Sequence, residues 1–371
     1  MHRLTPVVQH YAWGSYDGLA RVSGRPHPTA EPEAELWMGA HEGAPAGLTV
    51  DGASTTLDQV IAADPVGWLG ASVAARFGAR LPFLLKVLAP AKALSIQAHP
   101  DADEATSAPE GTYVDGWPKP ESWLAIEPTE AFIGARPFGE FRSLAIDLGV
   151  ERLVDLVESA AVAESPSHEL LRLLLSANDA RALVDEVLTA CADRADDPTV
   201  EAVLRVARDF PGDIGLVVLL TMRRLALQPG DYVFLAAGVM HSLVSGLLVE
   251  VLANSDNVVR AGLTPKKIDV PELLRIVDVE RAMVPEPGDD VDGWTTYDAE
   301  TPYFRLRTRV LDDGAVAVPA TDQPRILLCL NGSADVDGLA LTSGESCFLA
   351  PGDEATITGD GTLYLASPGL P

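Results

Sequence analysis

The pattern of apolar and polar positions divides the chain into a β-rich first part, a helical middle and a β-rich end. Residues 1–140 contain short apolar runs separated by glycine and proline, which is typical of strands joined by turns. Residues 81–88 predict one such strand, and residues 56–61 predict a short helix with Thr55 or Thr56 as its cap. The first part is therefore expected to be mainly β-sheet.

The pattern changes near residue 142, where leucine and alanine begin to recur with the spacing of amphipathic helices. The predicted helices cover residues 150–157, 168–175, 179–193, 200–208 and 216–225. After them, residues 232–235 and 247–252 predict strands, and Pro271 predicts the start of a short helix. Residues 295–371 alternate as β-structure does, with turns at glycine and aspartate.

A faint repeat links the two β-rich parts. Residues 229–236 (PGDYVFLA) are echoed by residues 343–350 (SGESCFLA), a turn–strand–turn pattern typical of small double-sheet barrels. The second copy has no histidine at the place where His241 follows the first copy. We therefore predict a mainly β fold with an α-helical insertion, made of two cupin or jelly-roll barrels and a helical domain.

Several polar residues in the β-rich parts have the chemistry of a metal site. Gln97 and His99 are two positions apart in a predicted strand, so their side chains would lie on the same face. Together with Glu121 and His241 they offer oxygen and nitrogen donors that suit Zn²⁺. The spacing alone is also typical of an ordinary half-exposed strand face. Gln97 could also form a hydrogen bond to one of the metal-binding side chains instead of coordinating the metal itself.

The charge balance limits the partners of the chain and makes its few cations informative. The 371 residues carry 54 acidic and 27 basic side chains, a net charge of −27, which disfavours nucleic acids and anionic membranes as partners. Arg260, Lys266 and Lys267 nevertheless lie close together in the sequence. They predict a site for an anionic small molecule, although a solvated turn would have the same composition.

The remaining composition indicates a folded cytoplasmic protein. The first residues lack the apolar segment of a signal peptide, and the longest apolar run, at 214–222, is too short to span a bilayer. The cysteines, Cys191, Cys329 and Cys347, are odd in number and have no metal-binding spacing, so we expect reduced thiols in the core.

Longer motifs relate the chain to a known family. The motifs lie at residues 11–15 (YAWGS), 35–41 (ELWMGAH), 94–101 (LSIQAHPD), 119–121 (KPE) and 255–266 (SDNVVRAGLTPK). In these segments the chain resembles the type I mannose-6-phosphate isomerases, which are zinc-dependent cupin enzymes. The similarity covers residues from about 9 to 275, whereas the helical part and the C-terminal barrel agree in layout only.

The resemblance implies one Zn²⁺ per chain and a role for each of several residues. It implies the zinc ligands Gln97, His99, Glu121 and His241, the catalytic residues Arg260 and Lys119, and the substrate-binding residues Ser95, Glu250 and Lys266. It also implies the division of the chain into a discontinuous catalytic cupin domain (1–141 and 226–275), a helical insertion (142–225) and a C-terminal cupin-like domain without metal ligands (276–371).

One motif departs from the family, and one role stays open. Many members have Asn-His before Lys-Pro-Glu, whereas Trp117 and Pro118 stand here. A proton-transfer role of that histidine is therefore impossible in this chain. Lys119, Glu250, Asp256 and a zinc-bound water are the candidates for proton transfer, and Asp256 is equally suited to a structural turn.

The expected function is an aldose–ketose isomerase that interconverts mannose 6-phosphate and fructose 6-phosphate through a cis-enediol, with the metal polarising the sugar oxygens. An isomerase or epimerase acting on another sugar phosphate is the alternative within the enzymes. A metal-dependent sugar-phosphate sensor without turnover is the alternative outside them. We expect a monomer, and the sequence leaves the native metal and the direction of flux open.

Overall fold

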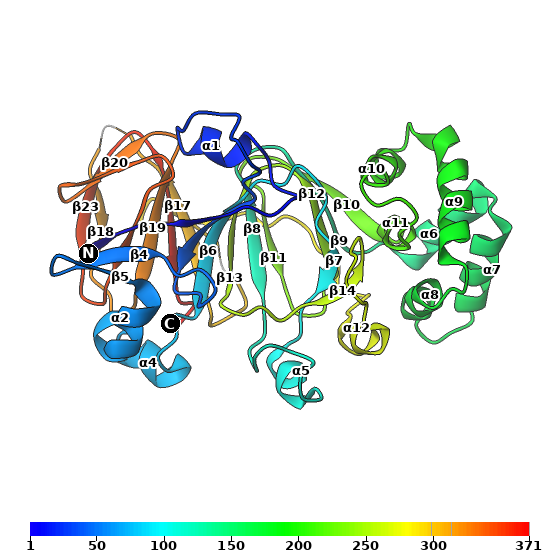
Figure 1. The fold of residues 1–371 in the computed structure, drawn as a ribbon, viewed down its shortest axis with the longest axis horizontal. Coiled ribbons are helices and arrows are strands. Elements are labelled where there is room, and N and C mark those ends of the chain that lie inside the picture. Colours follow the sequence, from blue (N-terminus) through cyan, green and yellow to red (C-terminus); the bar gives the residue numbers. More distant parts are fainter. Residues whose placement is uncertain (298, 313, 371) are drawn as a thin grey trace.

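The computed structural model describes residues 1–297, 299–312 and 314–370. Its elements follow one another as layers along the long axis, from a four-stranded sheet through seven-, six- and five-stranded sheets to a group of helices (Figure 1). Both chain ends lie on the side of the molecule that is remote from those helices. The fold is mainly β with a helical region, as the sequence predicts.

The six- and five-stranded sheets enclose the first barrel. The six-stranded sheet has the order β11 (Tyr232–Leu235), β8 (Glu121–Ala125), β13 (Leu248–Ala253), β6 (Phe83–Leu88), β3 (Glu35–Gly39) and β2 (Val7–Gln9). The five-stranded sheet has the order β10 (Met222–Leu227), β9 (Thr129–Ala135), β12 (His241–Ser245), β7 (Ile96–Ala98) and β14 (Val259–Gly262). Trp123 from one sheet and Ile133 and Leu243 from the other belong to a single buried apolar cluster, so the sheets face each other.

The seven- and four-stranded sheets form the second barrel in the same way. The first has the order β1 (His2–Leu4), β22 (Ser346–Leu349), β19 (Arg325–Leu330), β24 (Thr362–Ser367), β17 (Arg305–Val310), β16 (Trp294–Tyr297) and β15 (Asp289–Val291). The second has the order β18 (Val316–Val318), β23 (Ala355–Gly359), β20 (Ser333–Val336) and β21 (Leu339–Thr342). Leu327, Val336 and Ile357 share its core. The repeated segments form β11 and β22, one in each barrel.

The two barrels pack against each other through the six- and seven-stranded sheets. Residues alternate along β6, so that Phe83, Leu85 and Val87 point to the cluster that also contains Ile326 and Leu328. The same cluster is covered by α2 (Leu57–Ala63), α3 (Pro65–Leu69) and α4 (Ala71–Phe77), next to the hairpin of β4 (Gly47–Val50) and β5 (Ala53–Thr56). The N-cap of α2 is Thr56, one of the two predicted caps.

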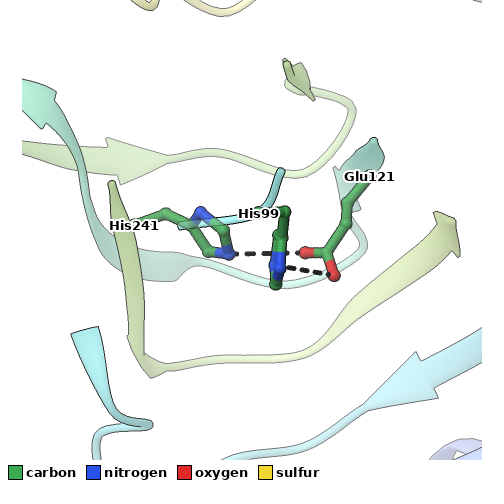
Figure 2. Close-up of side chains that lie close together, drawn as sticks. All are labelled: His99, Glu121 and His241. Atoms are coloured by element: carbon green, nitrogen blue, oxygen red, sulfur yellow. Dashed lines mark ion pairs between the residues drawn. The ribbon is translucent and has the colours of Figure 1, made fainter. Parts of the chain in front are cut away.

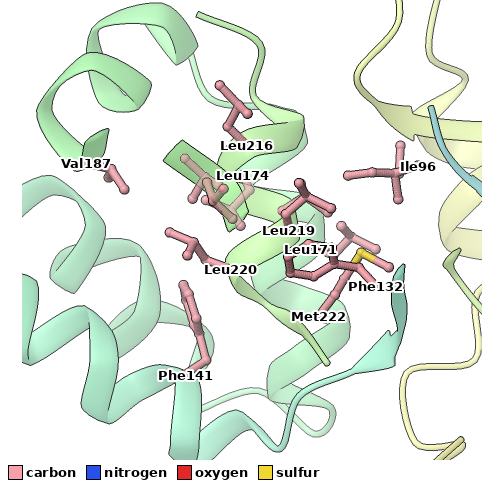
Figure 3. Packing of buried hydrophobic residues seen from close by; sticks show 14 of the residues in the cluster. Ile96, Phe132, Phe141, Leu171, Leu174, Val187, Leu216, Leu219, Leu220 and Met222 are labelled. Atoms are coloured by element: carbon pink, nitrogen blue, oxygen red, sulfur yellow. The ribbon is translucent and has the colours of Figure 1, made fainter. Parts of the chain in front are cut away.

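The helical group covers the outer face of the five-stranded sheet. It consists of α6 (Phe138–Leu148), α7 (Glu151–Ala160), α8 (Pro166–Leu175), α9 (Ala180–Cys191), a 3₁₀ turn at Ala192–Arg194, α10 (Pro198–Val206) and α11 (Gly215–Leu220). Its apolar core continues from Leu171 and Leu219 to Met222 of β10, Phe132 of β9 and Ile96 of β7 (Figure 3). The helices and the first barrel therefore share one core, in which the sheet supplies part of the apolar surface.

One predicted helix is wrong in its second half. Residues 216–225 were expected to be helical, but α11 ends at Leu220 and Met222–Leu227 form β10, which pairs with β9. Short helices also occur elsewhere, namely α1 (Gly18–Val22), α5 (Ala102–Ser107) and α12 (Val270–Ile276), which begins near Pro271 as predicted. Within the described residues, no helix combines the length and the apolar character that crossing a bilayer requires.

Candidate metal centre and cavity

Alternation along the strands of the first barrel turns polar side chains into its interior. In β8, Glu121 lies on the same face as the core residue Trp123, while Leu124 points outward to the second barrel. In the five-stranded sheet, Ile96 and Ala98 of β7 pack against the helices, which leaves Gln97 on the interior face. The sequence pattern thus places polar groups inside an otherwise apolar barrel.

His99, Glu121 and His241 converge at the bottom of this interior. The Nε2 atom of His99 lies 3.3 Å from one carboxylate oxygen of Glu121, and the Nε2 atom of His241 lies 3.4 Å from the other (Figure 2). All three side chains are almost completely buried, and their candidate ligand atoms lie within 4.8 Å of one another. They come from three different strands or strand ends.

The hydrogen bonds of the two histidines fix their ring nitrogens. Nδ1 of His99 lies 2.7 Å from the carbonyl oxygen of Asn257, and Nδ1 of His241 lies 3.0 Å from that of Val239. Since a carbonyl only accepts, each Nδ1 is the protonated nitrogen, and in a neutral ring Nε2 carries a lone pair. Both Nε2 atoms are buried and lack a hydrogen-bond partner among the described residues.

The protonation states make this cluster electron-rich. Burial, helped by the charge of Lys119, lowers the pKa of His99 to about 4, so its ring is neutral at pH 7. Burial opposes ionisation of Glu121, but the charge of Lys119 lowers the pKa of this carboxyl well below its usual range. The lone pair of the neutral His99 ring therefore faces a carboxylate, an arrangement that a cation between them would stabilise.

The spacing of the cluster is compatible with a metal ion such as Zn²⁺. Ligand atoms about 2.05 Å from a tetrahedral zinc ion are about 3.3 Å from one another. The distances between the histidine nitrogens and the Glu121 oxygens are 3.3 and 3.4 Å. His99, Glu121 and His241 thus combine donor types that zinc prefers, mutual proximity and two buried nitrogens that have no hydrogen-bond partner among the described residues.

The register of the sheet brings Gln97 to the same place. Its Cα atom lies opposite that of His241 in β12 and opposite that of Arg260 in β14. Residues directly opposite in antiparallel strands project to the same face, so these three side chains are neighbours inside the barrel. Ligation by Gln97 stays a prediction, and the register is the observation that supports it.

A cavity of about 870 Å³ opens from this cluster. Among the predicted residues, those that line it are Ser95, Gln97, Lys119, Glu121, Glu250, Arg260 and Lys266. His99 and His241 lie buried beside Glu121, behind the cavity wall. Asp209 and Phe210, from the connection between α10 and α11, also line the cavity, so the helical group contributes to its wall. The cavity is large enough for a phosphorylated sugar.

A buried ion network beneath the cavity was not predicted from the sequence. The ammonium group of Lys86 lies 3.3 Å from a carboxylate oxygen of Glu35 and 3.1 Å from one of Glu250. The indole N–H of Trp37 donates to Glu35, and that of Trp123 donates to Glu250 over 2.8 Å. Lys86, Glu35 and Glu250 all line the cavity although each is nearly inaccessible to solvent.

This network keeps a positive charge fixed inside the barrel. Burial opposes the charged form of Lys86, but the carboxylates of Glu35 and Glu250 raise its pKa. Burial also raises the pKa of Glu250, against the attraction of Lys86. A charged residue inside the apolar run of β6 was the available sequence signal, because such a residue is rarely buried without partners.

The other cations of the cavity differ in their pairing. The ammonium group of Lys119 lies 3.1 Å from an oxygen of Glu121, and that of Lys92 lies 3.2 Å from one of Asp209. Within the described part of the chain, the side chains of Arg260 and Lys266 form no ion pair or hydrogen bond, and burial lowers the pKa of the Arg260 guanidinium. Two cationic side chains thus line the cavity without a side-chain partner among the residues that the structure describes.

Asp256 lies between this cavity and a second one of about 370 Å³. Its carboxylate accepts a hydrogen bond from Nε2 of His41 over 3.2 Å, and this bond lowers its pKa. Nδ1 of His41 accepts from the backbone N–H of Gly43, which fixes the tautomer. His41 is thus linked to a cavity residue, whereas the exposed His10 bonds to the carbonyl of Pro32 and lies outside the lining.

Trp117 and Pro118 do not line the cavity within the described residues. Instead, the guanidinium of Arg80 lies 4.0 Å from the centre of a Trp117 ring, which also packs against Phe77 and Tyr303. The backbone carbonyl of Trp117 accepts a hydrogen bond from the side-chain amide of Asn257. The backbone carbonyl of Asn257 in turn accepts from Nδ1 of His99. Trp117 is thus linked through Asn257 to the His99 ring from outside the cavity.

Known proteins similar to this chain in sequence and fold include mannose-6-phosphate isomerases. Residues 1–138 match the family described as phosphomannose isomerase type I, catalytic domain. The chain is 33% identical to the mannose-6-phosphate isomerase of Salmonella typhimurium over 99% of this chain and 98% of that protein. It is 34% identical to the enzyme of the same name from Homo sapiens over 89% of this chain and 87% of that protein.

Solved structures agree with these matches. A crystal structure of a mutant phosphomannose isomerase from Salmonella typhimurium has a TM-score of 0.90 and 30% identity, covering 100% of both chains. A zinc-bound mannose 6-phosphate isomerase also gives 0.90 and 30%, covering 100% of this chain and 99% of that one. The resemblance inferred from the motifs is confirmed, and the chain belongs to the type I mannose-6-phosphate isomerase family.

Proposed function

We propose that this protein is a zinc-dependent isomerase that interconverts mannose 6-phosphate and fructose 6-phosphate. The observation that carries the proposal is the cluster of His99, Glu121 and His241, with buried and unsatisfied nitrogens, at the base of a cavity of about 870 Å³. Relatives that align with nearly the whole chain are named for this activity, which favours it over another sugar phosphate or a sensor without turnover.

One Zn²⁺ per chain would be held by His99, Glu121, His241 and Gln97. When bound, this ion would supply Lewis-acid polarisation of the sugar oxygens. The carbonyl groups that hold the Nδ1 atoms keep both imidazoles in the orientation and tautomer needed for binding. The neutral state of His99 at pH 7 removes competition from protons for its ligand nitrogen.

The cavity cations have separate proposed roles. Isomerisation moves a proton between C1 and C2 of the sugar, and negative charge develops on a sugar oxygen in the transition state. Arg260 lies opposite Gln97 and has no protein partner among the described residues, so its guanidinium would stabilise that charge. Lys266 would bind the phosphate, while Ser95 and Glu250 would contact the sugar.

Asp256 is the best placed of the proton-transfer candidates. Its carboxylate lines the cavity and is about half exposed, and the bond from His41 lowers its pKa further below neutrality. Glu250 and Lys119 are already engaged, the first with Lys86 and the second with Glu121. Lys119 would then act mainly by its charge, holding Glu121 ionised and adding positive potential near the reacting oxygens.

The predicted domain division is proposed on the same basis. The first barrel would be the catalytic domain, the helices from α6 to α11 the insertion, and the second barrel a domain without a metal site among the described residues. The bounds differ locally from the prediction, because β1 pairs with β22 of the second barrel and β10 with β9 of the first. The cysteines are free and buried, which supports a reducing cytoplasmic environment. We further propose a monomer that binds neither nucleic acid nor membranes, in line with the net charge of −27.

A coupled assay tests the activity and the metal together. Protein stripped with a chelator should not convert mannose 6-phosphate to fructose 6-phosphate, and one equivalent of Zn²⁺ should restore turnover. His27→Ala, which changes an exposed histidine outside the cavity lining, serves as the control and should behave as the wild type. Zinc binding without turnover would contradict the isomerase proposal and favour another sugar phosphate or a sensor.

A further inference from the structure

A carboxylate from the helical group holds the chain segment that follows β14. Asp213 precedes α11, and one of its carboxylate oxygens accepts from the backbone N–H of Gly215 over 2.7 Å and from that of Leu263 over 3.0 Å. The other oxygen accepts from the N–H of Thr264 over 3.2 Å. Two of these three donors belong to a segment about fifty positions further along the chain.

The backbones of the two segments are in direct contact at this point. A Cβ atom added to Gly262 would lie 2.4 Å from Cα of Gly215, and one added to Gly215 would lie 2.7 Å from the nitrogen of Leu263. The end of β14 and the start of α11 can approach this closely only because both residues are glycines. The end of β14 is therefore packed directly against the backbone of the helical group.

The segment held by Asp213 has an unfavourable backbone conformation. Leu263 has φ of +55°, in the left-handed region that a bulky residue rarely adopts. Its side chain is almost fully buried against the helical core, and its N–H points to Asp213. A conformation of this kind persists only where surrounding contacts impose it, and such residues are often found at ligand sites.

The same segment forms one wall of the candidate substrate cavity. Leu263, Thr264, Pro265 and Lys266 all line it. The hydrogen bonds from Leu263 and Thr264 to Asp213 are called the clamp below. Arg260 precedes the clamp and is held independently, since its backbone pairs with Gln97 of β7. Lys266 follows the clamp and is exposed, and its backbone N–H donates to the hydroxyl of Thr264. Releasing Asp213 should therefore free Lys266 but leave Arg260 in place.

We propose that Asp213 is a positioning residue of the helical insertion that fixes the turn at 263–264 and so presents Lys266 to the phosphate of the substrate. The inference rests on the proposed function for the identity of the substrate, but not for the clamp itself. It gives the helical insertion a part in substrate affinity, although none of the predicted metal ligands or catalytic residues belongs to it.

The test combines kinetics with hydrogen exchange on the zinc-loaded full chain. Asp213→Ala should raise KM for mannose 6-phosphate at least tenfold, with kcat within about threefold of wild type. The amides of residues 263 and 264 should exchange faster. Asp213→Asn keeps an oxygen that can accept from Gly215 and Leu263, so its KM should lie between those of the wild type and Asp213→Ala.

A matched control separates this role from general stabilisation. Asp197→Ala removes another carboxylate of the helical group that accepts two backbone N–H bonds, at the start of α10 and outside the cavity lining. It should lower the thermal midpoint without changing KM. If Asp213 acts through Lys266, Lys266→Ala should raise KM, and adding Asp213→Ala to it should have little further effect.

Two results would overturn the proposal. One is an Asp213→Asn or folded Asp213→Ala protein whose KM stays within twofold of wild type. The other is unchanged exchange at residues 263 and 264 in Asp213→Ala. If wild-type protein fails to turn over mannose 6-phosphate, the proposed function fails instead, and faster exchange in the variant would still support the clamp.

Discussion

The buried network around Lys86 predicts an unusual dependence of stability on pH in the variant Lys86→Met. Methionine fills a similar volume, but it leaves the carboxylates of Glu35 and Glu250 in the barrel without the cation that lies 3.3 and 3.1 Å from them. Both carboxyls are nearly inaccessible to solvent. Removing one partner of a buried ion pair typically costs 3–5 kcal/mol, because an uncompensated charge remains.

The size of the effect follows from protonation. The variant can avoid two unpaired buried charges by taking up one proton, and the ordinary pKa of a glutamate is 4.5. At pH 7.5, protonating such a group costs about 4 kcal/mol, at about 1.36 kcal/mol for each pH unit. The folded variant would then bind one proton more than the unfolded chain, so its stability falls by about 1.4 kcal/mol per unit as the pH rises.

Urea unfolding of metal-free protein at pH 5.5 to 8.0, followed by tryptophan fluorescence, measures this difference. Relative to wild type, Lys86→Met should be about 4 kcal/mol less stable at pH 7.5 and about 1.4 kcal/mol less stable at pH 5.5. The control Arg142→Met breaks an exposed pair with Glu158 and should leave stability close to that of the wild type at every pH. Glu250→Gln added to Lys86→Met should remove the slope.

A pH-independent loss in Lys86→Met would refute this reasoning. It would mean that both carboxylates stay ionised, or that water enters the barrel and solvates them. A loss below about 1 kcal/mol at pH 7.5 would show that the pair with Lys86 contributes no more than an exposed salt bridge.

The other predictions concern the candidate metal-binding residues and the cavity. His99→Ala and His241→Ala should each lose bound zinc and turnover, measured by elemental analysis and the coupled assay, and zinc retained at wild-type affinity in both would contradict their ligand roles. Arg260→Ala should keep its zinc but lose about 10²–10³ in kcat, equivalent to about 3–4 kcal/mol in the barrier, and unchanged kcat would exclude a role at the reacting oxygen. In metal-free wild type, the pKa of His99 falls from 6.5 in the unfolded chain to about 4 in the folded one. As the pH drops from 6.5 to 4, the unfolded chain binds a proton there and the folded chain does not, so stability should fall by about 3 kcal/mol. This part of the loss should be absent in His99→Gln.

The sequence pointed to individual candidate residues of the site, but not to the strand pairing that brings them together. The motifs singled out Gln97, His99 and Glu121 because these residues lie in short segments whose polar positions stand out against apolar runs. Lys86 was not singled out, since its charge sits in a run that otherwise reads as a buried strand, and its partner Glu35 lies in β3. Which strands become neighbours depends on contacts between residues far apart in the sequence, and a local sequence pattern does not predict those contacts.

The errors in secondary structure have a similarly local cause. The helical pattern at residues 216–225 continues past the true end of α11 because leucines follow on both sides and neither glycine nor proline marks the boundary. Thr221 ends the helix, and pairing with β9 then imposes the strand on residues 222–227. Tertiary pairing overrides the local preference there.

The charge of the cavity shows how so acidic a chain could bind an anion. Carboxylates neutralise most of the cavity cations: Lys86, Lys119 and Lys92 all have acidic partners within 3.3 Å. Arg260 and Lys266 stand apart, since no described side chain pairs with either. A sugar phosphate would therefore find the paired cations already compensated and these two available. Because these two cations lie before and after the turn that Asp213 holds, we expect the selectivity of the cavity for an anion to depend on this short segment.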